Sequence, residues 1–383
     1  MPEPVIGVES LFFSLMVSFV LILYIILFFP ILRRSFRLKS KNRYNTLLLI
    51  ILLGIVALFI SLPFSATGFY LFMPLNYYVI VVVGALALFF FIFAILKKET
   101  LDEEAYNKRL TEGFDRNLDK SLLDTHNFTT KQELKRKLFH LSAILYIFTW
   151  VLQPIIFFGV RILYEGIINT PTFENYYNIQ LLFNESIEGL LLNGLIVQFF
   201  MLLCIFIGNA NAEVMRLRFN NYGFPLKKTL ATTRRSTEVY DTSASMLLLM
   251  GLAVSSLILT YGSQHRIAGI YAQMAIISIS VFSDMFAALI GRRFGKHKWP
   301  IVKGKSFEGS IAGCVVGFIS AMFFVGWFLA LIGVLIFVFT DIALAKVEIS
   351  DNASNPILMA IVFKLLIIFV DPMITILPYI KIW

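Results

Sequence analysis

Residues 310–345 read SIAGCVVGFISAMFFVGWFLALIGVLIFVFTDIALA, the longest apolar run in the chain. A membrane-crossing helix needs about 20 mostly apolar residues, so we divide these 36 residues near Gly326 into two spans. Of the 383 residues, 58% are hydrophobic and 15% are charged, and the mean hydropathy is +0.80. Soluble domains usually carry about 25% charged residues. The sequence therefore predicts an all-α, polytopic integral membrane protein.

Other apolar runs of similar length bring the prediction to about ten transmembrane helices. The first five spans are Leu11–Leu32, Thr46–Phe64, Leu75–Leu96, Leu138–Val160 and Ile187–Gly208. The second five are Thr242–Thr260, Ile267–Ile290, Ser310–Val325, Gly326–Ala345 and Pro356–Ile380.

The distribution of basic residues predicts the orientation of these spans. With an outside N-terminus, 29 of the 33 Lys and Arg residues fall in the inside loops and only three fall outside. Cytoplasmic loops of membrane proteins carry such an excess of Lys and Arg. We therefore expect both termini outside or in a lumen. The inside loops are residues 33–45, 97–137, 209–241, 291–309 and 346–355.

Three regions follow from this topology. Residues 1–96 form an N-terminal three-helix membrane region without a recognisable functional motif, and residues 97–137 form a charged cytosolic linker. Residues 138–383 hold the remaining spans and the candidate chemistry. The two cysteines, Cys204 and Cys314, lie in apolar stretches and indicate no disulfide framework.

The loop after the seventh span carries the strongest chemical signal. Asp284 is expected one to two turns from the cytosolic end of an apolar helix, where an acid is costly and usually functional or paired. Glycines let backbone N–H groups approach an anion, and Lys and Arg neutralise its charge. The next helix starts at residues 306–310 and brings Glu308 as a second carboxylate. This combination suits Mg²⁺ and a nucleoside triphosphate, although a solvated basic loop with a capping acid is the plainer alternative.

The same loop resembles the polyprenol kinase family, which includes dolichol kinase, phytol kinase and the CTP-dependent diacylglycerol kinases and is distantly related to phosphatidate cytidylyltransferase. The first part of the pattern matches Asp284, Ala287, Gly291 and Gly295. Its second part matches Lys305, Ser306, Glu308, Gly309 and Ser310, and Lys298-Trp299-Pro300 is most similar to the dolichol kinase branch. Ser283 stands where the family usually has a glycine.

Further family motifs follow in order over residues 131–380. They are Arg136-Lys137 with His140, Glu213 with Arg216, Arg235 with Glu238, and Asp351-Asn352 before Pro356. Each has a structural alternative. His140 could be a packing residue, the two Glu and Arg pairs could be surface ion pairs at i, i+3 spacing, and Asp351 and Asn352 could cap the last helix.

The resemblance implies transfer of the γ-phosphate of CTP to dolichol or a related lipid alcohol in the bilayer, with Mg²⁺, at the cytosolic face of the ER or cell membrane. It implies catalytic roles for Asp284, Lys305 and Glu308, with Asp284 as metal ligand or general base and Glu308 as second ligand or helix-start acid. The implied nucleotide-binding residues are Gly291, Arg292, Arg293, Gly295, Lys296, Lys298, Ser306, Gly309 and Ser310.

Three other functions compete with this interpretation. A cytidylyltransferase that forms a CDP-lipid usually carries a late His-Gly-Gly segment, but no histidine follows His297. A kinase acting on phytol, geranylgeraniol or diacylglycerol fits the motifs equally well. A transporter would need acids spread over several spans near the midplane, whereas the acids here gather at one face. No feature indicates nucleic acid, and the oligomeric state is not readable.

The charge distribution makes a direct prediction about sidedness. Single cysteines placed at Lys120 and Lys303 should react with a membrane-impermeant thiol reagent only after sealed, right-side-out vesicles are opened, because both loops are expected to face the cytosol. Labelling of either cysteine in sealed vesicles would contradict the topology.

Overall fold

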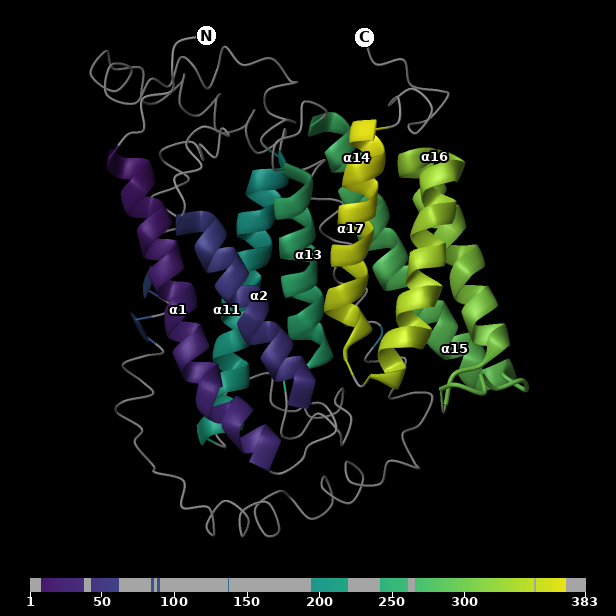
Figure 1. Cartoon of the computed structure of the whole chain (residues 1–383), viewed down its shortest axis with the longest axis horizontal. Coiled ribbons are helices and arrows are strands. Elements are labelled where there is room, and N and C mark those ends of the chain that lie inside the picture. Colours follow the sequence, from purple (N-terminus) through teal and green to yellow (C-terminus); the bar gives the residue numbers. More distant parts are fainter. Residues whose placement is uncertain are drawn as a thin grey trace, which may run out of the picture.

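Figure 1 shows the computed structural model of the chain. The structure describes residues 8–37, 43–61, 84–85, 88–89, 137, 194–219, 242–260, 266–302, 304–347 and 349–369. Every regular element within these residues is helical, which confirms the predicted all-α class. The fourth predicted span, most of the third and nearly all of the predicted linker lie outside the described residues.

The first two helices, α1 (Val8–Arg37) and α2 (Arg43–Ser61), pack against each other along their length. On α1 the buried residues Leu21, Tyr24 and Phe28 recur at helical spacing, while Phe19 and Phe29 on other faces are exposed. A helix that is apolar all round belongs in a protein core or in lipid. Both helices begin three residues before the predicted spans, and α1 also continues five residues beyond its predicted end.

The central helices follow the predicted spans but differ at their ends. They are α11 (Gly194–Phe219), α13 (Ala244–Thr260), α14 (Arg266–Ser278), a π-helical turn (Ile279–Ser283), α15 (Asp284–Phe294) and α17 (Asp351–Phe369). The fifth span was predicted to end at Gly208, but α11 continues to Phe219 because the residues after Gly208 include good helix formers such as Ala, Glu, Met and Arg.

The last span was predicted to begin at Pro356, but α17 begins five residues earlier, at Asp351. Ser350 precedes the helix, and its hydroxyl accepts a hydrogen bond from the Asn352 N–H at 3.3 Å. This is the usual N-cap interaction, so the helix start is set by the serine rather than by the proline.

The apolar run quoted above forms α16 (Phe307–Lys346), which is broken at Gly326. Gly326 has φ 72° and ψ 175°, a conformation that glycine adopts without steric cost. A straight helix between Lys305 and Asp341 would separate them by about 54 Å, yet their side chains form an ion pair. The run therefore folds back on itself as two antiparallel arms, and the predicted division near Gly326 is confirmed.

Five helical stretches of the described chain are long and apolar enough to cross a membrane. They are Leu15–Arg37, Arg43–Ile60, Ala268–Phe294, Phe307–Lys346 and Asp351–Phe369. This set is consistent with an integral membrane protein of several spans. The predicted count of ten extends over residues that the structure does not describe.

Small residues bring the helices around the first arm of α16 close together. A Cβ built on Gly313 would lie 2.8 Å from the Ser283 carbonyl oxygen, and one on Gly317 would lie 2.0 Å from the Ser283 hydroxyl. On the second arm, a Cβ built on Gly333 would lie 2.5 Å from the end of the Ile279 side chain. Small residues allow such close contact between membrane helices, and here they hold the turn before Asp284 against both arms.

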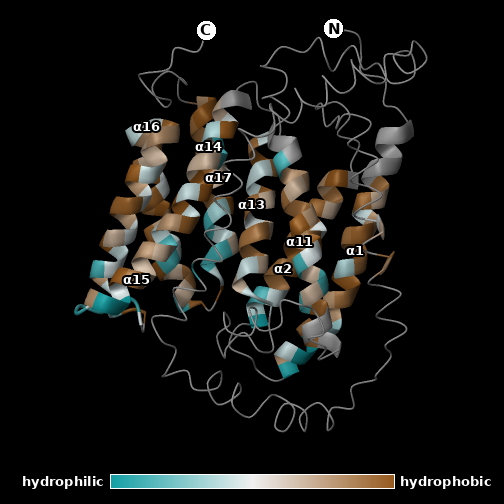
Figure 2. Cartoon of the chain, turned by 180° about the vertical axis from the view of Figure 1, so that it is seen from behind, coloured by the Kyte–Doolittle hydropathy of each residue, from teal (hydrophilic) through white to brown (hydrophobic). Residues whose placement is uncertain are grey.

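The segments predicted to be cytosolic meet at one end of the helix bundle, where the polar residues gather (Figure 2). Contacts between segments distant in sequence show this directly. They join Arg34 to the Leu217 carbonyl, Asn45 to Ser350, Lys137 to Asp284, and Lys305 to Asp351. The described residues of these five segments, which share a side in the charge-based topology, therefore lie at one end of the bundle.

A test of the close packing is Gly313→Val. The new side chain meets the backbone oxygen of Ser283, which cannot move without displacing the helix, so we expect a loss of about 2–3 kcal/mol in the free energy of unfolding. The control is Ile311→Val, whose side chain is exposed. Thermal unfolding in detergent measures both, and equal midpoints for the two variants would contradict the packing.

Candidate functional site

Asp284 is the first residue of α15 and directly follows the π-helical turn. We had expected it one to two turns from the helix end, but α15 continues for ten residues to Phe294, nearly three turns. The polar residues Gly291, Arg292 and Arg293 remain helical because the pairing with α16 continues to that point. Asp284 therefore lies deeper in the bundle than predicted.

The carboxylate of Asp284 forms an ion pair with the ammonium of Lys137. Lys137 is only 2% exposed, and Asp284 is 24% exposed. A buried ammonium requires a charged or hydrogen-bonding partner. The structure thus brings together two residues that the sequence placed in separate motifs, 147 positions apart.

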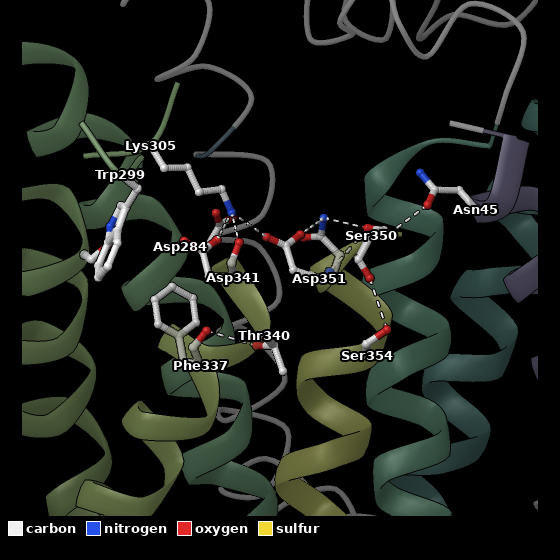
Figure 3. Close-up of polar contacts among 12 residues, drawn as sticks. Asn45, Asp284, Trp299, Lys305, Phe337, Thr340, Asp341, Ser350, Asp351 and Ser354 are labelled. Atoms are coloured by element: carbon white, nitrogen blue, oxygen red, sulfur yellow. Dashed lines mark hydrogen bonds and ion pairs between the residues drawn. The ribbon is translucent and has the colours of Figure 1, made fainter. Parts of the chain in front are cut away.

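Lys305 lies at the centre of a second set of charges (Figure 3). Its ammonium forms an ion pair with the Asp341 carboxylate, donates to the Asp341 backbone carbonyl, and lies 3.6 Å from an oxygen of Asp351. Burial opposes the charge on Lys305, but the nearby carboxylates of Asp351 and Asp341, with a contribution from Asp284, raise its pKa above the ordinary value. Lys305 is therefore fully charged at neutral pH.

Asp341 was missed in the sequence. It is mostly buried, near the end of the second arm of α16, and it makes the closest contact with Lys305. The signal was its position, since Asp341 is the only acid in the apolar run 310–345 and acids within membrane spans usually have a paired or functional role. We had taken this part of the run as plain membrane span.

Asp351 and Asn352 occupy the first turn of α17 rather than the loop before it. The Asn352 side-chain amide donates to Asp351 Oδ1 at 3.2 Å and to Ser350 Oγ at 3.1 Å. The Ser350 N–H in turn donates to Asn45 Oδ1 at 2.9 Å (Figure 3). Asn45 lies in the first turn of α2, so the N-terminal region contacts the turn that holds Asp351.

Glu308 faces away from this cluster. Its carboxylate accepts hydrogen bonds from the His297 backbone N–H, at 3.0 and 3.3 Å, and lies 2.6 Å from His297 Nδ1. These contacts fasten the loop to the start of α16, which is the helix-start role that the sequence left open. In the part of the chain that the structure describes, no group of three or more Asp, Glu, His or Cys side chains is arranged to hold a metal ion.

The glycines predicted to cradle phosphates pack against other parts of the protein. A Cβ on Gly295 would lie 2.4 Å from the Ser306 hydroxyl, and one on Gly309 would lie 2.6 Å from the Ala287 carbonyl oxygen. Gly291 lies beside the same serine. Ser306 caps α16 by accepting the Gly309 N–H at 3.2 Å. These residues are therefore required for the close approach of α15 and α16.

The predicted phosphate-binding cations lie at the far end of α15 and in the loop beyond it. Arg292 and Arg293 are in the last turn of α15, and Lys296 and Lys298 follow it, all four with exposed side chains. Arg292 is about 12 Å from Asp284 along the helix axis. Ser310, which we also assigned to the nucleotide, accepts the Trp299 indole N–H at 3.0 Å.

Glu213 is buried on α11, and its carboxylate accepts the Ser243 N–H at 2.8 Å, which joins α11 to the residue before α13. Arg216 is on the same helix. The remaining predicted site residues lie outside the described part of the chain. They are Arg136, His140, Arg235 and Glu238.

No protein-family model, curated protein or solved structure matches this chain. The fold and the site thus define a class only: a helical protein of apolar, membrane-compatible spans with a partly buried lysine and carboxylate cluster at one end of the bundle.

The cluster predicts an order of stability effects. Asp341→Asn should lower the free energy of unfolding by about 3 kcal/mol, because it removes the most buried partner of a mostly buried ammonium. Asp351→Asn should cost about 1 kcal/mol or less, since that contact is longer and more exposed. Lys346→Ala, an exposed residue at the same end of α16, is the control. Chemical unfolding in detergent would contradict the assignment if Asp351→Asn were the more damaging change.

Proposed function

We propose that this protein is a CTP-dependent lipid-alcohol kinase, which transfers the γ-phosphate of CTP to dolichol or a related polyprenol. One observation carries the proposal. Lys137, Asp284, Lys305 and Asp351 come from three separate motifs of the polyprenol kinase pattern, Asp284 and Lys305 from the two parts of one, and they meet in two adjoining charge clusters at one end of the bundle. If each motif only stabilised its own loop, there would be no reason for these four side chains to lie together.

The location suits a reaction between a lipid and a soluble nucleotide. The alcohol of a polyprenol lies at the membrane surface, while CTP arrives from the cytosol. The cluster is at the ends of apolar helices, and Asp284, Lys305 and Asp351 are each about a quarter to a third exposed. Phosphoryl transfer depends mainly on positioning and on stabilisation of charge, and these side chains supply charge of both signs.

In this proposal the Lys305 ammonium neutralises the phosphate oxygens of CTP. The phosphate would then contact the same ammonium as Asp341 and Asp351 do. Lys137 forms an ion pair with the Asp284 carboxylate. Asp284 serves either as a ligand of Mg²⁺ or as the base that accepts the proton of the lipid hydroxyl.

Mg²⁺ prefers oxygen ligands and is often held by one or two carboxylates together with substrate phosphates. The carboxylates of Asp284 and Asp351 fit that requirement, whereas Glu308 is engaged with His297. Bound Mg²⁺ would neutralise phosphate charge. The protein residues orient the nucleotide and hold the proton acceptor beside the lipid alcohol.

The second candidate is a cytidylyltransferase, which would also use CTP but would form a CDP-lipid from a lipid phosphate. Purified protein with CTP labelled at either the γ-phosphate or the cytosine, and a panel of dolichol, shorter polyprenols, phytol, geranylgeraniol, diacylglycerol and phosphatidate, separates the two. Label from the γ-phosphate in the lipid means kinase, and label from the base means cytidylyltransferase. Neither label in any lipid would overturn the proposal.

The two roles of Asp284 predict different behaviour for Asp284→Asn. If Asp284 holds Mg²⁺, the variant should lose Mg–CTP affinity as well as turnover, and if it is only the base it should lose turnover alone. We expect the first result, with turnover lower by about two to three decades, the usual cost of a lost transition-state charge interaction of about 3–4 kcal/mol. Calorimetry with Mg–CTP beside a kinase assay measures both quantities.

Lys305→Ala should reduce turnover by a similar factor, because phosphate charge is left unpaired. Lys120→Ala changes a basic residue of the linker that belongs to no motif, and it should keep near-normal activity. Normal turnover of Asp284→Asn would refute the assigned site.

A further inference from the structure

The loop between α15 and α16, Gly295–Ser306, is held firmly by its own hydrogen bonds. The Trp299 N–H donates to the Lys305 carbonyl at 3.1 Å, and the Phe307 N–H donates to the His297 carbonyl at 2.9 Å. The Trp299 ring also stacks on Phe307, with centroids 3.7 Å apart. The loop therefore presents a defined surface.

That surface exposes two large apolar side chains among its polar ones. Phe294, the last residue of α15, is 54% exposed, and Ile301 at the tip of the loop is 57% exposed. Large apolar side chains held outward on a rigid loop mark a contact with another apolar phase or molecule. Since their own loop is already well packed, these two side chains are available for such a contact.

Basic residues alternate with the apolar ones along the same segment. Arg293, Lys296 and Lys298 are exposed, and the Arg293 guanidinium lies 5.3 Å from the centre of the Phe294 ring. Segments that combine aromatic or aliphatic side chains with Lys and Arg bind the headgroup region of bilayers that contain anionic lipids. Their charge complements lipid phosphates.

The loop also lies at the depth and on the side where such lipids would be. The first arm of α16, from Phe307 to Val325, has a length of about 28 Å, close to the hydrocarbon thickness of about 30 Å, so Phe307 lies near the membrane boundary. An exposed apolar stripe at i, i+4 spacing runs along this arm to the loop. Its members are Phe307, Ile311, Val315, Ile319 and Phe323.

Figure 1 shows the loop at the lower edge of the bundle, reaching sideways on the side away from α1. The Trp299 ring stacks on Phe307, the member of the stripe nearest the loop, and its indole N–H donates to the Ser310 hydroxyl. Trp is enriched at this level of membrane proteins because its ring is apolar and its N–H is polar. The loop thus continues the face that the α16 stripe turns toward lipid.

We propose that residues 293–301 form a membrane-interface anchor, in which Phe294 and Ile301 enter the headgroup region of the bilayer and Arg293, Lys296 and Lys298 bind the phosphates of anionic phospholipids. This role is independent of the proposed kinase activity. It assigns to lipid three cations that the family resemblance assigns to CTP, so the two assignments can be separated by experiment.

The test uses the full-length chain with Cys204 and Cys314 replaced by alanine and Ile301→Cys carrying an environment-sensitive fluorophore. The protein is placed in nanodiscs of phosphatidylcholine, with or without phosphatidylglycerol, and a lipid spin-labelled near the headgroup serves as quencher. We expect blue-shifted emission and quenching by the spin label, both increased by phosphatidylglycerol and decreased by salt.

Removing single charges provides the matched comparison. Lys296→Gln and Lys298→Gln should each reduce the ratio of quenched to unquenched loop in phosphatidylglycerol nanodiscs by about fivefold. Lys346→Gln, which removes an exposed cation at the same end of α16, should leave it unchanged. The proposal would be overturned if the fluorophore emitted as it does in water and were not quenched. It would also be overturned if the quenching were the same with and without phosphatidylglycerol. A response to Mg–CTP without a response to lipid would overturn it too and return the cations to the nucleotide.

Discussion

The arrangement at the lower end of the bundle depends on one partly buried ammonium, that of Lys305. Lys305 precedes α16, yet it pairs with Asp341 at the end of the second arm and with Asp351 at the start of α17. A mostly buried charge is tolerated only with partners, so this lysine fixes three chain segments relative to one another. The hairpin break at Gly326 makes the contact geometrically available, and the glycines of α15 and α16 bring Asp284 to the same place.

In the proposed function, the ion pairs that stabilise the fold would also have to take part in nucleotide binding and phosphoryl transfer. In the structure Lys137, Lys305 and the three aspartates satisfy one another, so an incoming triphosphate competes with carboxylates for the two ammonium groups. Asp351 is the partner best suited to release Lys305, because its contact is the longest and its side chain is about a third exposed. Asn45 holds the turn that carries Asp351, which gives the N-terminal helices, otherwise without a motif, a part in the site.

Much of the architecture could be predicted because it depends on local composition. The apolar runs predicted the helices, and Gly326 marked the break in α16. The distribution of Lys and Arg predicted which loop segments lie at a common end, as far as the structure describes them. Contacts such as Lys137 with Asp284 depend on how helices pack, and no spacing within one sequence reveals them. The helix ends were misplaced because hydropathy does not register polar residues that remain helical, as in α11. Asp341 was different, since an isolated acid in an apolar run was a visible signal, whereas the attachment of Glu308 to His297 was not.

The central claim of the proposal is that one nucleotide site unites the chain segments around Asp284, Lys305 and Asp351. Photo-crosslinking with a CTP analogue that reacts through its phosphate chain, followed by peptide mapping, tests it most directly because it needs no substitution and no turnover. The account predicts adducts in the segments around Asp284, Lys305 and Asp351, all suppressed by excess CTP. Adducts confined to other helices, or none that CTP suppresses, would contradict it.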